Sequence, residues 1–329
     1  MKILRPQVYS KALSLGGLVL LWGGVAGMSG DQPAGAPPPE ATLLKTAWRN
    51  TRLEEFDLAE QGFNTVLRAL DTQSAAEHAA PPALQLRANA LYGLGLVSSL
   101  GHHGKNPAAT QRRLRAVIDL VPHSELAAWA ALALAREAYL PVNTDAPEVR
   151  AEVQKCYAQV VADYPQSVAA QEAFVYLQAS HIQALEAGQL RQSLRAIDTY
   201  LQEHPQARFR SALHTLQSKA YSRLQEYPQS LAAAIKALET REIDPTNPWQ
   251  NNVADYFQIA LMAQYDVGDF VTARRYYNQF LKEYPQDQRA FTVQMQLQRM
   301  QQTEAQLRAE TPPPRRGTTN AAGAQGARP

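Results

Sequence analysis

Residues 283–287 read Glu-Tyr-Pro-Gln-Asp, and similar words return at 163–167 (Asp-Tyr-Pro-Gln-Ser), 203–207 (Glu-His-Pro-Gln-Ala) and 242–245 (Glu-Ile-Asp-Pro). Prolines recur at a nearly fixed interval, because the steps between them are 40, 43, 40, 40 and 40 residues. A period of this size is typical of stacked supersecondary units. The sequence therefore predicts a repeat architecture, punctuated by Pro82, Pro122, Pro165, Pro205, Pro245 and Pro285.

The segments between these prolines have a helical composition. Alanine, leucine, glutamine, glutamate and arginine dominate, and long alternations of β-branched residues are absent. In residues 253–267 apolar side chains recur at three- and four-residue spacing, which is typical of an amphipathic helix. Gly268-Asp269 interrupts the pattern, and a second apolar face follows to residue 280. Each unit thus predicts two helices.

The last unit resembles a tetratricopeptide repeat, in which a Gly-Asp-aromatic turn joins two antiparallel helices. A small residue, an aromatic residue and a closing proline follow the turn. Residues 174–205, and less completely 43–70, show the same pattern. HEAT-type repeats have a similar period, but the Gly-Asp-Phe turn argues against them. The matching residues are Gly268, Asp269, Phe270, Ala273, Tyr277 and Pro285 in the last unit, and Gly188, Tyr200 and Pro205 in the earlier one.

This resemblance implies the fold class and the extent of the repeat domain. The expected fold is all-α, a right-handed α-solenoid of about six antiparallel helix pairs with a C-terminal capping helix. The repeats would occupy residues 41–308, after a proline-rich linker at 31–40 and before a disordered tail at 309–329. Residues 286–308 carry apolar side chains among glutamines and arginines, so this segment could cap the solenoid or mediate self-association.

The first 30 residues resemble an export signal. Three basic residues precede a charge-free, largely apolar run at 12–30, and small residues make up its last part. The expectation is a cleaved signal peptide, with an uncleaved anchor that tethers the chain to the inner membrane through residues 12–30 as the alternative. Either outcome predicts an exported protein of the periplasm or cell envelope.

No catalytic, cofactor-binding or metal-binding motif stands out, so the chain is not expected to be an enzyme. The seven histidines show no metal-ligand spacing, although His102-His103 could bind a metal weakly. The single cysteine, Cys156, excludes an intramolecular disulfide. The net charge is +2 and falls to −1 without residues 1–27, so nucleic acid is not an expected partner.

In tetratricopeptide stacks the first helix of each unit lines a concave groove, which implies a site for a protein or peptide partner. A clamp for a C-terminal carboxylate is doubtful, because Leu44 and Trp48 stand where the family has lysine and asparagine. Trp48 and Tyr265 have an alternative place, in the solenoid core. The groove residues that the resemblance implies are Leu44, Lys45, Trp48, Arg52, Gln178, Ile182, Gln258, Met262 and Tyr265.

The leading functional hypothesis is a non-catalytic exported scaffold that mediates protein–protein interactions in the bacterial cell envelope. The alternative is an exported module that binds glycans or other polymers through aromatic platforms, for which Trp48, Trp129 and Trp249 are candidates.

Overall fold

The computed structural model describes residues 39–100, 106–139, 147–183, 186–244, 247 and 250–310, and all regular structure in these residues is helical. This confirms the predicted all-α class. The proposed signal segment, most of the linker, Pro245 and residues 311–329 lie outside the described residues. The helices form two compact units, up to Phe209 and from Arg210. The elements of the first unit are α2 (Pro39–Arg52), α3 (Phe56–Asp71), α4 (Ala75–His78), α5 (Pro81–Leu100), α6 (Pro107–Leu120), α7 (Glu125–Tyr139), α8 (Pro147–Asp163), α9 (Val168–Gln183) and α10 (Ala187–Glu203).

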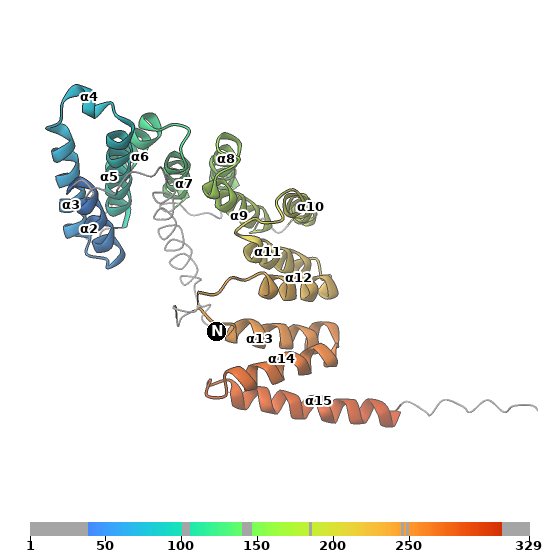
Figure 1. Ribbon diagram of the computed structural model, residues 1–329. Coiled ribbons are helices and arrows are strands. Elements are labelled where there is room, and N and C mark those ends of the chain that lie inside the picture. Colours follow the sequence, from blue (N-terminus) through green and yellow to red (C-terminus); the bar gives the residue numbers. More distant parts are fainter. Residues whose placement is uncertain are drawn as a thin grey trace, which may run out of the picture. The chain divides into compact units, whose positions relative to one another are not determined.

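Helices of the first unit pack in consecutive pairs (Figure 1). Helix α2 packs against α3, α5 against α6, α7 against α8 and α9 against α10. The second helix of one pair also packs against the first helix of the next, as α3 does with α5 and α8 with α9. In addition the first helices contact one another, α2 with α5, α5 with α7 and α7 with α9. This is the arrangement that the tetratricopeptide resemblance implied; the handedness and the number of pairs stay predictions.

The second unit repeats this pairing. Helix α11 (Arg210–Arg223) packs against α12 (Tyr227–Glu239), and α13 (Val253–Leu261) packs against α14 (Phe270–Glu283). The last helix, α15 (Ala290–Glu310), packs on α14 and reaches beyond its end (Figure 1). The helix predicted over 253–267 is not uniform, because its last six residues, Met262–Val267, form a π-helical turn, η1.

The recurring proline words form one kind of turn between a second helix and the next first helix. The residue two positions after the proline donates its backbone N–H to the carbonyl of the residue just before the proline: Ser167 to Tyr164 at 2.9 Å and Asp287 to Tyr284 at 3.1 Å. Proline suits the second position of such a turn because its fixed φ matches the required backbone. Ser167 then accepts a hydrogen bond from the Ala170 amide at 2.9 Å, which caps α9. The same backbone bond joins Ala207 to His204 and Ser124 to Val121.

The Gly-Asp-Phe turn joins α13 and η1 to α14. Gly268 has φ +78, a left-handed backbone that glycine adopts without a steric penalty. Asp269 caps α14, since its Oδ1 accepts from the Thr272 amide at 3.0 Å. Ala273 and Tyr277 are fully buried, and the Tyr277 hydroxyl donates to Gln264 Oε1 at 2.8 Å. The small side chain thus lets the helices of this pair approach closely while the aromatic ring fills the core beside them.

Close helix approach also shapes the core of the first unit. Trp48 of α2 meets Phe63 of α3 edge to face, with ring centroids 5.1 Å apart, and lies 6.1 Å from Tyr92 of α5. Gly93 leaves room for Phe63, because a Cβ there would lie 2.2 Å from the Phe63 Cζ. These contacts connect three helices through one cluster of rings.

Candidate partner-binding face

The first helices of the first unit contact one another in a row, α2 with α5, α5 with α7 and α7 with α9. We call the solvent-accessible side chains of these four helices the first-helix face. On α2 the predicted groove residues divide by burial. Lys45 and Arg52 are exposed, Leu44 is half-buried, and Trp48 is only 6% exposed. Trp48 therefore belongs to the core, the second of its two anticipated places, and the charged residues beside it form the accessible surface.

The predicted groove residues of α9 are both buried. Gln178 is 3% and Ile182 is 2% exposed. The Gln178 Oε1 has no hydrogen-bond partner among the described residues. In this structure these two side chains contribute to packing and offer a partner little surface.

The other predicted groove residues, Gln258, Met262 and Tyr265, belong to the second unit. Met262 is buried, whereas Gln258 is exposed and Tyr265 is 58% exposed. Tyr265 lies in the π-helical turn and donates its hydroxyl hydrogen to Gln296 Oε1 of α15 at 2.6 Å. Its ring is thus outside the core but tethered to the last helix.

An ion pair that the sequence did not reveal lies among the first helices. Arg136 of α7 places Nη1 3.6 Å from Glu172 Oε1 of α9, and its guanidinium lies over the Tyr176 ring, 5.4 Å from the centroid. The same Glu172 oxygen accepts a hydrogen bond from the Tyr176 hydroxyl at 2.9 Å. The Arg136 side chain is 29% exposed and that of Glu172 is 3% exposed, so only the cation reaches the surface.

Burial and charge govern the acid–base behaviour of this cluster. Burial raises the pKa of Glu172, while Arg136 and the Tyr176 hydrogen bond oppose that rise. Burial likewise raises the pKa of Tyr176 and of Tyr92. The tyrosines therefore stay neutral at physiological pH, and Arg136 supplies the positive charge of the cluster.

No sequence signal pointed to this cluster, because Arg136 and Glu172 are far apart in the chain and meet only when α7 packs against α9. The exposed residues of α2 add Arg49 to Lys45 and Arg52. The exposed charged side chains of α2 are therefore all basic. Helix α7 also carries the exposed Glu125, whose carboxylate accepts hydrogen bonds from the Val168 and Ala169 amides at the start of α9.

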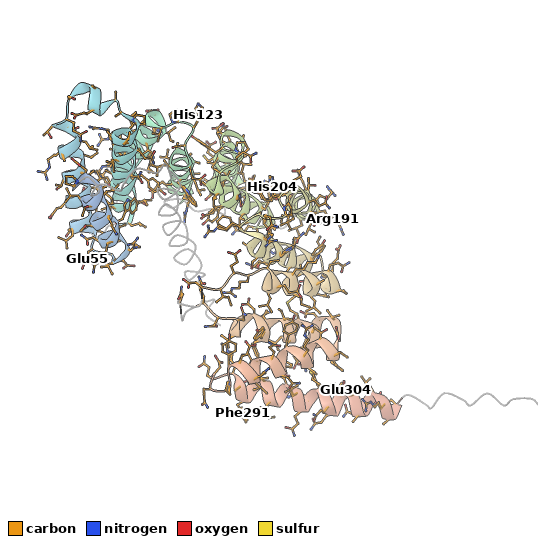
Figure 2. All side chains as sticks on the ribbon, in the orientation of Figure 1. Glu55, His123, Arg191, His204, Phe291 and Glu304 are labelled. Carbon is orange, nitrogen blue, oxygen red and sulfur yellow. The ribbon has the colours of Figure 1, made fainter. Side chains whose placement is uncertain are left out.

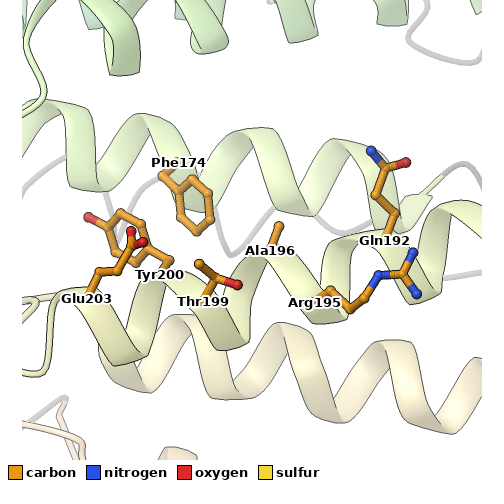
Figure 3. A pocket seen from close by; sticks show the side chains of 7 residues that line it. All are labelled: Phe174, Gln192, Arg195, Ala196, Thr199, Tyr200 and Glu203. Carbon is orange, nitrogen blue, oxygen red and sulfur yellow. The ribbon is translucent and has the colours of Figure 1, made fainter.

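A separate open hollow of about 440 Å³ lies on α9 and α10 (Figure 3). Its aromatic end is the Phe174 ring stacked on Tyr200, with centroids 4.1 Å apart, and Arg195 lies toward its other end. Tyr200 also packs against the His204 ring, with the ring centroids 4.5 Å apart. His204 thus has the packing role of the tyrosines at equivalent turns. The hollow is lined by Phe174, Gln192, Arg195, Ala196, Thr199, Tyr200 and Glu203.

The described residues show no arrangement suited to metal binding, since none of their histidine, cysteine, aspartate and glutamate side chains gather in groups of three or more that could hold an ion. Burial raises the pKa of the Cys156 thiol, so the thiol is a weak nucleophile at neutral pH. Within the described part of the chain, no helix is both long enough and apolar enough to cross a bilayer.

Neither a protein-family model nor a curated protein matches this chain. Solved structures do show similarity. Pseudomonas aeruginosa PilF has a TM-score of 0.48 at 12% identity, covering 81% of this chain and 97% of PilF. PilW, described as a widely conserved type IV pilus biogenesis factor, has a TM-score of 0.47 at 15% identity, covering 78% of this chain and 99% of PilW. A thermophilic TPR protein of Thermus thermophilus has a TM-score of 0.40 at 13% identity, covering 68% of this chain and 99% of that protein. Similarity at this level does not transfer function.

Proposed function

We propose that the protein is a non-catalytic scaffold of the bacterial cell envelope, which binds a partner protein or an extended peptide on the first-helix face. The observation that carries this proposal is the contact of α2, α5, α7 and α9 along one side of the first unit. Such a row of helices presents a continuous surface longer than any single helix offers. The envelope location depends on the sequence of residues 1–30, which lie outside the described residues.

The charges of this face suggest the chemistry of the partner. Lys45, Arg49 and Arg52 are exposed along α2, and on α7 the half-buried Arg136, which is paired with Glu172, also reaches the surface. A planar guanidinium that is held against a ring loses little freedom when it binds a carboxylate. We therefore expect the partner segment to carry acidic side chains.

The glycan-binding alternative has less support. Trp48 is 6% exposed and Trp129 is 4% exposed, so neither offers a ring face on which a sugar could stack. Trp249 lies outside the described residues.

A charge-reversal experiment tests the proposal. Full-length wild-type protein and the Lys45→Glu/Arg52→Glu variant are each used to capture partners from an envelope extract, with quantification by mass spectrometry. The matched control is Arg112→Glu/Arg115→Glu on α6, a second helix on which both arginines are exposed. We expect the captured amount of at least one partner to fall about tenfold with the α2 variant and to stay unchanged with the α6 variant. Identical partner sets for all three proteins would refute it.

A further inference from the structure

Helix α15 closes the second unit but leaves an uncharged stripe exposed. The stripe starts at Phe291 and continues at alternating steps of four and three residues. Its six residues, all exposed, are Phe291, Met295, Gln298, Gln302, Ala305 and Ala309. Phe291 is 71% and Met295 is 37% exposed. The terminal element of a helical stack normally presents a polar outer face, because nothing packs against it.

The opposite side of α15 already has its partner within the unit. Val293 and Met300 are fully buried, and Arg274 of α14 pairs with Glu304 at 2.6 Å. Figure 2 shows Phe291 near the start of this helix and Glu304 further along it. The exposed stripe has the alternating three- and four-residue spacing of a two-helix seam.

We propose that this stripe pairs with the α15 stripe of a second copy of the chain, antiparallel and centred near Met300. The occupant follows from the order of side-chain sizes along the stripe. In an antiparallel pair about this centre, Phe291 lies opposite Ala309 and Met295 opposite Ala305. Each large side chain thus meets a small one, and Gln298 lies opposite Gln302. A parallel pair would stack Phe291 on Phe291 and leave the two alanine layers underfilled.

The stripe spans residues 291–309, about 27 Å of helix. A contact along one stripe of this length lies near the small end of specific interfaces, which bury about 1,000 Å² in total. Because interfaces at the small end are typically weak and transient, we expect a dissociation constant on the order of 10–100 μM. Arg299 flanks the seam near its centre, where the two copies of this residue approach each other. Screening by salt should weaken their repulsion, so association should strengthen as ionic strength rises.

Sedimentation of the full-length protein between about 5 and 500 μM tests the association. The weight-average mass should rise from 36.3 kDa toward twice that value. Met295→Glu and Ala305→Glu should each weaken association at least tenfold, whereas Thr303→Glu, an exposed position off the stripe, should not. Circular dichroism shows whether each variant keeps its helices. A protein that stays monomeric throughout, or variants with equal effects on and off the stripe, would overturn the proposal.

Disulfide trapping tests the register. In a Cys156→Ser background, the Met295→Cys/Ala305→Cys protein should form a covalent dimer on mild oxidation. The single Met295→Cys protein should not, because the two copies of residue 295 would be about 15 Å apart along the helices. Efficient dimers of the single variant would show a parallel pair and overturn the proposal. Because this surface lies wholly in the second unit, its failure leaves the proposed function of the first-helix face untouched.

Discussion

Replacing Gly93 by alanine tests the packing of α3 against α5, on which the first unit depends. The added Cβ would lie 2.2 Å from Phe63 Cζ and 2.5 Å from Cε1. Phe63 is fully buried and held by Trp48, so its ring must shift by about 1 Å or more to restore normal contact. Overpacking of this kind costs about 1–3 kcal/mol.

The substitution would also stabilise the helix itself, and this gain offsets part of the steric cost. Alanine inside a helix is favoured over glycine by up to about 1 kcal/mol. We therefore expect Gly93→Ala to lower the free energy of unfolding by about 1–2 kcal/mol, since the steric cost exceeds the gain. Gly188→Ala is the matched control, because no atom outside its own stretch of helix lies within 4 Å of the added Cβ. This control should be neutral or slightly stabilised.

Urea unfolding followed by tryptophan fluorescence measures the effect, because Trp48 lies beside Phe63. The Gly93→Ala midpoint should fall by about 0.5–1 M. Phe63→Leu should partly relieve the clash. The loss in free energy of unfolding of the double variant should therefore be at least about 1 kcal/mol smaller than the sum of the losses of the two single variants. An unchanged or raised midpoint for Gly93→Ala would refute the packing described for α3 and α5.

Substitutions at three further positions have expected outcomes. Asp269→Ala should lower the free energy of unfolding by about 1 kcal/mol, because the helix cap is lost. Hydrogen bonds from Thr272 lower the pKa of Asp269 from 3.8, so the greater stability of the wild-type protein should disappear as the pH falls below that value. Gly268→Ala should cost about 1 kcal/mol at its positive φ, and Gly268→Asn less, in the same urea assay. Burial raises the pKa of Glu172 above 4.5, so the wild-type protein should lose stability relative to Glu172→Gln as the pH rises through the folded-state pKa. An equal pH dependence of the two free energies of unfolding between about pH 4 and 7 would contradict this.

The regular features of the fold could be predicted because they are local. The 40-residue recurrence and the Gly268-Asp269 turn depend on backbone preferences of glycine, aspartate and proline, which act within a few residues. The structure places those residues in the turns and caps that such preferences require. The division into two units at residue 209 was not predictable, because the proline spacing continues past it.

The candidate site could be predicted only in part, because burial depends on neighbours that are distant in sequence. The helical phase of α2 puts Lys45, Trp48 and Arg52 on one side, but Tyr92 of α5 and Phe63 of α3 bury the tryptophan. The π-helical turn changes the phase that an α-helix would give Tyr265. The ion pair of Arg136 with Glu172 required the contact of two helices, which no local pattern encodes.

Site-specific photo-crosslinking in cells tests most directly whether the first-helix face binds the partner. A photoreactive amino acid is placed singly at Lys45, Gln85 and Gln183 on first helices, and at Arg112 and Glu152 on second helices; all five positions are exposed. We expect adducts with one common partner from the first-helix positions and none from the second-helix positions. Adducts confined to α6 and α8, or equal yields on both sets, would contradict it.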